Sequence, residues 1–258
     1  FPTVYTIHNL ALKGEFDRRF AVEHRLPLQP PAGLEVSPEL LCNGMALGIS
    51  YADLITTVSP TYAREILTSE YGAGLDALLR RRASDLFGIL NGIDAEEFNP
   101  ATDPRLPVHF SADDLEPRTA VRRFLHRRTG LDESEAPVIG VVNRLFWQKG
   151  TDIAVDGVSR LLAEGTALQF VVLGTGDHVY HEQLQALERR FPRAVKLYLE
   201  FNPDLAQLIY GGSDMFLMPS RYEPCGLGQM IAMRYGSVPV VRHTGGLADT
   251  VIDADERP

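Results

Sequence analysis

The sequence predicts an α/β protein whose parallel sheets are covered by helices on both faces. From Pro137 onward, apolar runs of strand length alternate with stretches of helical periodicity, which is the pattern of a doubly wound sheet. These runs are apolar throughout rather than alternately polar, as expected of strands buried on both faces. With 258 residues, the chain can form one large domain or two small ones, each with its own core.

The first half of the chain has a looser version of this pattern. Strands are predicted at Thr3–Ile7, Leu54–Val58 and Leu86–Leu90, and a helix is predicted at Asn43–Tyr51. Ser59 followed by Pro60 is a helix start, with a capping side chain and a proline in the first turn. Prolines crowd residues 97–117, and a basic helix is predicted at Arg118–Arg128. We place a domain boundary after it, which gives domains of residues 1–130 and 131–258.

The second half is more regular. Its predicted strands are Val138–Asn143, Leu168–Leu173, Val195–Leu199, Met215–Met218 and Val238–Val241. Its predicted helices are Thr151–Glu164, His178–Phe191, Pro203–Gly211 and Gly228–Tyr235. Each strand therefore leads through a short turn into a helix, so these turns are expected along one edge of the sheet.

Composition narrows the function. The net charge of −9 argues against a general nucleic-acid binder, and no apolar run approaches the length that spans a membrane. Two cysteines, Cys42 and Cys225, do not make a disulfide framework and lack the spacing of a zinc site, which favours a reducing, cytoplasmic setting. Both ends of the chain look cut, because it starts in a strand-like run and stops soon after a helix begins.

The strongest functional pattern lies between residues 219 and 229. Glu223, Gly226 and Gly228 fall between a strand end and a helix start, which in a parallel sheet faces the ligand crevice. Glycine lets an anion approach the unpaired N–H groups of the first helical turn, and a nearby carboxylate can accept hydrogen bonds from hydroxyl groups. The pattern predicts a site for a phosphorylated sugar.

Two cations, Arg144 and Lys149, follow the first strand of the second half and suit a pyrophosphate. His8 ends the first strand, where it is either a structural histidine or a residue facing the sugar. Gly174-Thr-Gly176 is no dinucleotide fingerprint, because Val179 takes the third glycine position. The sequence also lacks a Walker motif and a Gly-x-Ser-x-Gly elbow.

Together these residues resemble the bacterial glycogen synthase and plant starch synthase family. The matching segments are Tyr5–Ala11, Thr57–Tyr62, Ile89–Asp94 with Asn99-Pro100, Arg144–Gly150 and Pro219–Asp249. The resemblance implies the GT-B architecture, in which two Rossmann-like domains face a cleft, with the first domain incomplete here. It also implies transfer of glucose from ADP-glucose to the non-reducing end of an α-1,4-glucan such as glycogen, starch or a maltooligosaccharide. The resemblance further implies that anomeric configuration is retained and that neither a metal nor a cofactor is required.

The resemblance also implies residue roles. Arg144 and Lys149 would bind the donor phosphates. Glucose hydroxyls would be held by Glu223 and by the backbone of Cys225, Gly226 and Leu227, and the distal phosphate by the N–H groups of Leu227 and Gly228. His8 would lie against the transferred glucose, Asn91 would line its pocket, and Phe201 would stack on adenine.

Two departures from the family leave alternatives open. Nothing in the sequence supplies the amino-terminal Lys-x-Gly-Gly-Leu loop, since Thr244-Gly-Gly-Leu247 belongs to the second half, and the carboxyl-terminal crossing helix is absent. We expect the full-length protein to be an enzyme, a hexosyltransferase, whereas this chain alone could be inactive. The alternatives are another GT-B enzyme that uses UDP-glucose, or a truncated chain that binds nucleotide or glucan without turnover. A plant origin would place the protein in the plastid stroma.

Overall fold

The computed structural model describes residues 1–256, so the last two positions of the expected second domain lie outside it. Contacts between Cα atoms divide the chain into two compact units. Unit 1 comprises Phe1–Asn91 together with two short later segments, Tyr222–Cys225 and Thr244–Asp249. Unit 2 comprises the remainder, from Gly92 onward. The expected boundary after residue 130 stays a prediction about the domains of the whole protein.

Unit 1 is built on a parallel sheet of order β1-β2-β3. Its elements are β1 (Val4–Ile7), α1 (Arg18–Glu23), η1 (Pro38–Cys42), α2 (Gly44–Tyr51), β2 (Leu54–Thr57), α3 (Pro60–Glu65), α4 (Asp76–Arg81), η2 (Ala83–Asp85) and β3 (Leu86–Gly88). The core lies between this sheet and the helices, where Ile7, Ile49, Ile55, Tyr62 and Leu79 are fully buried. The three strand predictions for the first half are therefore confirmed.

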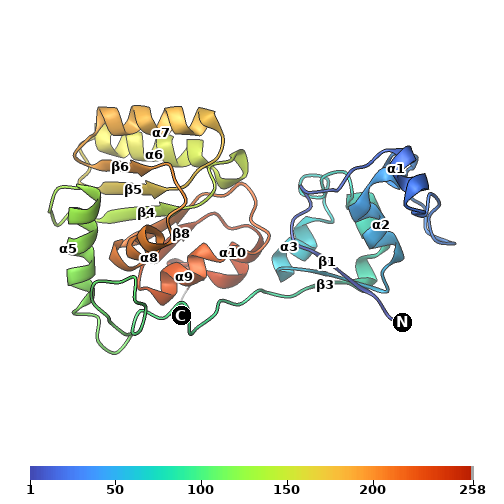
Figure 1. Cartoon of the computed structure of the whole chain (residues 1–258), viewed down its shortest axis with the longest axis horizontal. Coiled ribbons are helices and arrows are strands. Elements are labelled where there is room, and N and C mark those ends of the chain that lie inside the picture. Colours follow the sequence, from blue (N-terminus) through green and yellow to red (C-terminus); the bar gives the residue numbers. More distant parts are fainter. Residues whose placement is uncertain (257–258) are drawn as a thin grey trace. The chain divides into compact units, whose positions relative to one another are not determined.

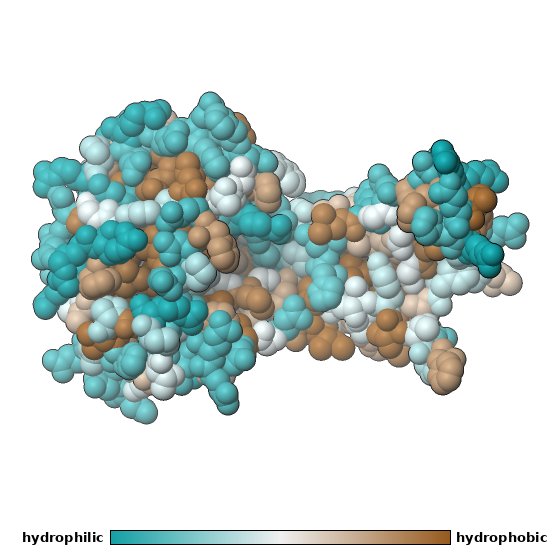
Figure 2. Space-filling model, in the orientation of Figure 1, coloured by the Kyte–Doolittle hydropathy of each residue, from teal (hydrophilic) through white to brown (hydrophobic). Residues whose placement is uncertain are grey.

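One face of this sheet is exposed. Val4 pairs with Leu54, and Thr56 pairs with Phe87, so these residues share a face, and Val4, Leu54 and Phe87 are all exposed. Hydrophobic surface is visible over this unit in Figure 2. Parallel strands are usually covered on both faces, and this sheet is covered on one.

Unit 2 contains a five-stranded parallel sheet of order β6-β5-β4-β7-β8. Its strands are β4 (Val138–Val142), β5 (Gln169–Leu173), β6 (Val195–Tyr198), β7 (Met215–Met218) and β8 (Val238–Val241). Its helices are α5 (Arg118–Thr129), η3 (Trp147–Lys149), α6 (Thr151–Ala163), α7 (His178–Arg190), α8 (Pro203–Gly212), α9 (Gly228–Arg234) and η4 (Ala254–Glu256), while α10 (Gly245–Thr250) packs mainly with unit 1. The predicted alternation of strands and helices is confirmed.

Helices cover both faces of this sheet. Val141 of β4 joins the core formed with α6 and α7, which lie together along one side of the sheet in Figure 1. The neighbouring Gly140 faces α8 instead, because a Cβ there would lie 2.7 Å from Ile209 and 2.5 Å from Ser213. Alternate residues of β4 thus pack against opposite helical layers, which explains why the strand is apolar throughout.

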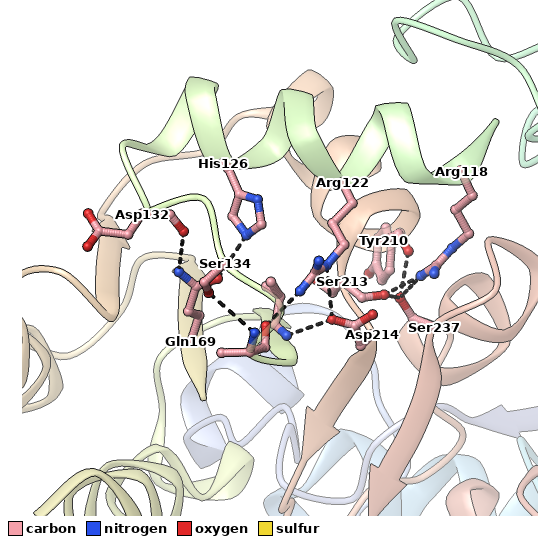
Figure 3. Close-up of polar contacts among 12 residues, drawn as sticks. Arg118, Arg122, His126, Asp132, Ser134, Gln169, Tyr210, Ser213, Asp214 and Ser237 are labelled. Atoms are coloured by element: carbon pink, nitrogen blue, oxygen red, sulfur yellow. Dashed lines mark hydrogen bonds and ion pairs between the residues drawn. The ribbon is translucent and has the colours of Figure 1, made fainter. Parts of the chain in front are cut away.

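The predicted basic helix exists as α5, and two of its arginines, Arg118 and Arg122, make structural contacts (Figure 3). Arg118 donates to the backbone oxygens of Tyr235, at 3.1 Å, and Ser213. Arg122 donates to Ala136 O at 2.6 Å. Burial lowers the pKa of Arg118, and the carbonyl acceptors offset the loss of water around its charge. These contacts fasten α5 to the ends of the strands opposite the predicted ligand edge.

No helix within residues 1–256 is long and apolar enough to span a lipid bilayer.

Candidate functional site

The sheet of unit 2 changes its direction of growth between β4 and β7. The chain adds β5 and β6 on one side of β4 and then returns to place β7 on the other side. In open parallel sheets, ligands bind outside the carboxyl ends of the strands at such a switch point. Arg144 follows β4, and Pro219 follows β7, so the two predicted phosphate-site segments begin at this position.

The loops after β4 and β7 are packed tightly together. A Cβ on Gly150 would lie 2.2 Å from Pro219 O, so only glycine fits at the end of η3. Arg221 donates its backbone N–H to Gln148 O at 2.8 Å. Lys149, the last residue of η3, lines a small hollow that Pro219 also lines. The structure therefore places Lys149 at the junction of the two loops.

A larger pocket, of about 480 Å³, opens at the ends of β4, β5 and β6. Arg144 lines it from the loop after β4, and its guanidinium lies 5.6 Å from the centre of the Phe146 ring. Phe201 lines it from the loop after β6 and is 89% exposed. Residues spaced at helical intervals on α8 form one wall: Pro203, Ala206, Gln207 and Tyr210. The pocket thus combines a cation with an unshielded aromatic ring, a pairing suited to a nucleotide.

Sequence reasoning missed one wall of this pocket. Glu97, Phe98 and Arg105 line it from the proline-rich segment that precedes α5. Arg105 is held by Asp103, whose Oδ1 accepts from its Nε at 2.7 Å, and Tyr235 donates to Asp103 Oδ2 at 2.6 Å. Burial alone would raise the pKa of Asp103, but the hydrogen bonds from Arg105 and Tyr235 outweigh it, so the pKa is lowered. The only signal in the sequence was the resemblance at Asn99-Pro100.

The turn into α9 carries the predicted glycines. Gly226 has a φ of 73°, a left-handed conformation that suits glycine. Gly228 is the first residue of α9, and a Cβ there would lie 3.2 Å from the Phe216 ring. Leu227, between them, is 43% exposed. The backbone at the start of α9 is therefore fixed by a turn and by close packing on β7.

The remaining predicted residues lie in unit 1, which also contains the segment Tyr222–Cys225. The Asn9 side chain, next to exposed His8 at the end of β1, hydrogen-bonds the Tyr222 phenol. The backbone of Asn91, beyond β3, hydrogen-bonds the Cys225 thiol. Burial raises the pKa of that thiol, so it is neutral at physiological pH.

Glu223 itself is 5% exposed. It lies in the segment whose two end residues, Tyr222 and Cys225, hydrogen-bond Asn9 and Asn91 respectively. The structure therefore groups Glu223 and Cys225 with the strand ends that carry His8 and Asn91. Within residues 1–256, no group of three or more His, Cys, Asp or Glu side chains could hold a metal ion.

The parallel sheets with a pocket at the strand ends are typical of Rossmann-like domains, and the solved structures that match the chain identify its fold as that of the GT-B glycosyltransferases. The catalytic domain of starch synthase IV from Arabidopsis thaliana, solved with ADP and acarbose, superimposes with a TM-score of 0.85 and 36% identity, covering 98% of this chain and 53% of that one. HepE from Anabaena, solved with UDP, matches with a TM-score of 0.59 at 20% identity over 98% of this chain and 56% of its own, which shows the fold alone.

The family models narrow the assignment from the fold to a protein family. The model described as glycosyl transferases group 1 matches residues 122–257, and the starch synthase catalytic domain model matches residues 1–81. The chain belongs to the glycosyl transferases group 1 family. It is 52% identical to a glycogen synthase of Kosmotoga olearia over 96% of this chain and 52% of that protein, and 50% identical to one of Anaeromyxobacter dehalogenans over 98% and 53%. The chain thus spans about half the length of the curated relatives it matches.

Proposed function

We propose that the intact protein transfers glucose from ADP-glucose to the non-reducing end of an α-1,4-glucan with retention of anomeric configuration. The observation that carries this proposal is the 52% identity to a named glycogen synthase across nearly the whole chain. A starch synthase that was solved with ADP and acarbose, and that superimposes at a TM-score of 0.85, supports the same nucleotide and a glucan-like acceptor.

The nucleotide would occupy the pocket of unit 2. Phe201 presents an exposed ring for stacking on the base, which is typically worth about 1–3 kcal/mol. Arg144 lines the same pocket and can pair with the diphosphate through two N–H groups. Lys149, at the neighbouring loop junction, would add a second positive charge, and the N–H groups of Leu227 and Gly228 would meet the distal phosphate.

The glucose unit would be held by the segment around Glu223. The Glu223 carboxylate would accept hydrogen bonds from glucose hydroxyls, as would suit a nearly buried acceptor. The backbone of Cys225, Gly226 and Leu227 would hold further hydroxyls, while His8 and Asn91 would line the sugar pocket from the strand ends of unit 1.

The proposed chemistry assigns a role to each of these positions. The bond between glucose C1 and the phosphate oxygen breaks, and ADP leaves with an added negative charge. Arg144 and Lys149 stabilise that charge, which grows in the transition state. An acceptor hydroxyl forms the new bond on the same face of the sugar, and its proton passes to the leaving phosphate. Glu223 positions the sugar and is not assigned as a nucleophile.

The test is an elongation assay on the intact protein with ADP-glucose and a maltooligosaccharide. Removing one charge-stabilising group typically costs about 10²–10³ in turnover, so Arg144→Ala and Lys149→Ala should each lose that much. Arg160→Ala removes an exposed cation from α6 of the same unit and should leave turnover unchanged. Rates of both variants within about threefold of wild type would remove these cations from the mechanism.

Two further experiments test the alternative functions, a UDP-glucose donor and nucleotide binding without turnover. UDP-glucose replaces ADP-glucose in the same assay, and a preference for it would overturn the donor assignment. Calorimetry with ADP on residues 1–258 alone tests whether this chain binds nucleotide without turnover. We keep a cytoplasmic location within the proposal, because two cysteines in 258 residues do not make a disulfide framework.

A further inference from the structure

Two short helices of unit 1, far apart in the sequence, bind each other's first turns through carboxylates. Asp249, in α10, accepts from Thr61 N at 2.8 Å and from Thr61 Oγ1 at 2.6 Å, at the start of α3. Glu65, at the end of α3, accepts from Thr244 Oγ1 at 2.9 Å and from Gly245 N at 3.0 Å, at the start of α10. Each acid therefore satisfies a backbone N–H that lacks a partner within its own helix.

The same two helices hold the backbone of the segment that contains Glu223. Gly246 N, in α10, donates to Glu223 O at 3.0 Å. Ser59, which caps α3, donates its hydroxyl to Pro224 O at 2.6 Å and accepts from Tyr62 N at 3.1 Å. The hydrogen bonds thus form a closed ring that runs from α3 to α10, on to Glu223 and Pro224, and back to α3.

Close packing makes this ring rigid. A Cβ on Gly245 would lie 1.9 Å from Glu223 O, and one on Gly246 would lie 2.1 Å from Cys225 O, so α10 presses directly on the segment's backbone. Glu65 uses one oxygen for both of its bonds, whereas its Oε2 is buried with no hydrogen-bond partner among the described residues. A change at either acid would therefore shift the segment that contains Glu223 through the hydrogen bonds that Gly246 and Ser59 donate to it.

We propose that Glu65 and Asp249 are positioning residues that hold the Glu223 segment in the geometry required for the donor sugar. This inference rests on the proposed function, because the role of Glu223 belongs to it. Neither acid needs to touch the substrate: both act on the backbone that carries Glu223. An error of 1 Å in a positioned group can cost about 10²-fold in rate, so a small shift of this segment is enough to matter.

The experiment compares Glu65→Ala, Asp249→Ala and the double variant in the intact protein. We expect turnover with ADP-glucose to fall at least about tenfold in each single variant, while the Kd for ADP stays within about twofold. The double variant should lose little more than either single variant, because both acids maintain one ring. Glu65→Gln keeps an accepting oxygen and places its amide N–H₂ at the unpartnered Oε2 position, so it should recover most of the turnover.

Asp17→Ala is the matched control, because Asp17 caps α1 in the same unit by accepting from Phe20 N at 2.7 Å. It should lower the melting temperature as the ring variants do, without changing turnover. If Glu65→Ala and Asp249→Ala weaken the binding of ADP and ADP-glucose equally, the inference is overturned. It is also overturned if Asp17→Ala lowers turnover as much as they do, because general destabilisation would then explain the loss. A wild-type protein that transfers no glucose would refute the proposed function instead, so the two failures are distinguishable.

Discussion

Arg221 fastens the loop after β7 to the turn that carries Lys149, and this contact can be measured directly. Its guanidinium donates to Asp152 Oδ1 at 2.8 Å and to Oδ2 at 2.6 Å, and it also donates to Trp147 O at 2.9 Å. It lies 4.8 Å from the centre of the Trp147 ring. The perturbation is a double-mutant cycle with Arg221→Met, which keeps an apolar chain over Trp147, and the isosteric Asp152→Asn.

The expected coupling follows from geometry and exposure. Hydrogen bonds to charged groups contribute about 1.5–3 kcal/mol when buried, while fully exposed ion pairs contribute about 0.2–1 kcal/mol. The side chains of Arg221 and Asp152 are 21% and 39% exposed, so solvent screens the pair in part. We expect a coupling of about 1–2 kcal/mol in the free energy of unfolding at pH 7.

The pH dependence has a definite sign. The hydrogen bond from Arg221 lowers the pKa of Asp152 below its usual range, although burial opposes the shift. A lowered pKa means that the stabilisation is present above the unfolded-state value, about 3.9, and is lost as the pH falls through the folded-state value. Urea titrations of the intact protein at pH 7 and near pH 3 measure both quantities. A coupling under about 0.5 kcal/mol at pH 7, or one unchanged in acid, would refute this reasoning.

Two further substitutions test the pocket of unit 2. Phe201→Ala should weaken ADP binding about 5- to 100-fold in calorimetry, because the base loses its stacking partner. Since the ring is exposed, the same change should leave the free energy of unfolding within about 0.5 kcal/mol of wild type. Phe201→Tyr keeps an aromatic ring and should keep the affinity for ADP. Tyr235→Phe removes the hydroxyl that donates to buried Asp103 and should cost about 1.5–3 kcal/mol of unfolding free energy in urea titrations. Tyr198→Phe, whose hydroxyl makes only a 3.5 Å contact, is the control and should cost less than about 0.5 kcal/mol.

Each of these two predictions has a result that would contradict it. If Phe201→Ala binds ADP as tightly as wild type, the base does not stack on that ring. If Tyr235→Phe is as stable as Tyr198→Phe, the Asp103 carboxylate does not depend on the Tyr235 hydroxyl, and the wall formed by the segment before α5 must be held in another way.

The sheet of unit 2 could be predicted because its signals are local. Strands such as Gln169–Leu173 are buried at every position, and the helices between them show apolar residues at helical spacing. The side chain of Ser59 and the proline after it predict a helix cap, and Ser59 Oγ accepts from Tyr62 N as expected. Such features depend on residues within one turn of each other.

The wall formed by Glu97, Phe98 and Arg105 could not be predicted in the same way. The segment has neither helical nor strand periodicity, and its prolines are typical of a loop. Its place at the pocket depends on Asp103, which hydrogen-bonds Tyr235 from 132 positions away. No local sequence pattern identifies a partner so far away in the sequence, so this wall of the pocket could be found only in the structure.

The two glycine-rich turns of the later half show how one residue type meets two different demands. The sequence predicts an anion site at the first of them, around Gly226 and Gly228. Gly226 does take a left-handed conformation at the start of α9, in keeping with that expectation. Gly246 has another reason to be glycine, because a side chain there would collide with Cys225 O at 2.1 Å. Its N–H donates to Glu223 O, so the second turn holds the backbone of the first.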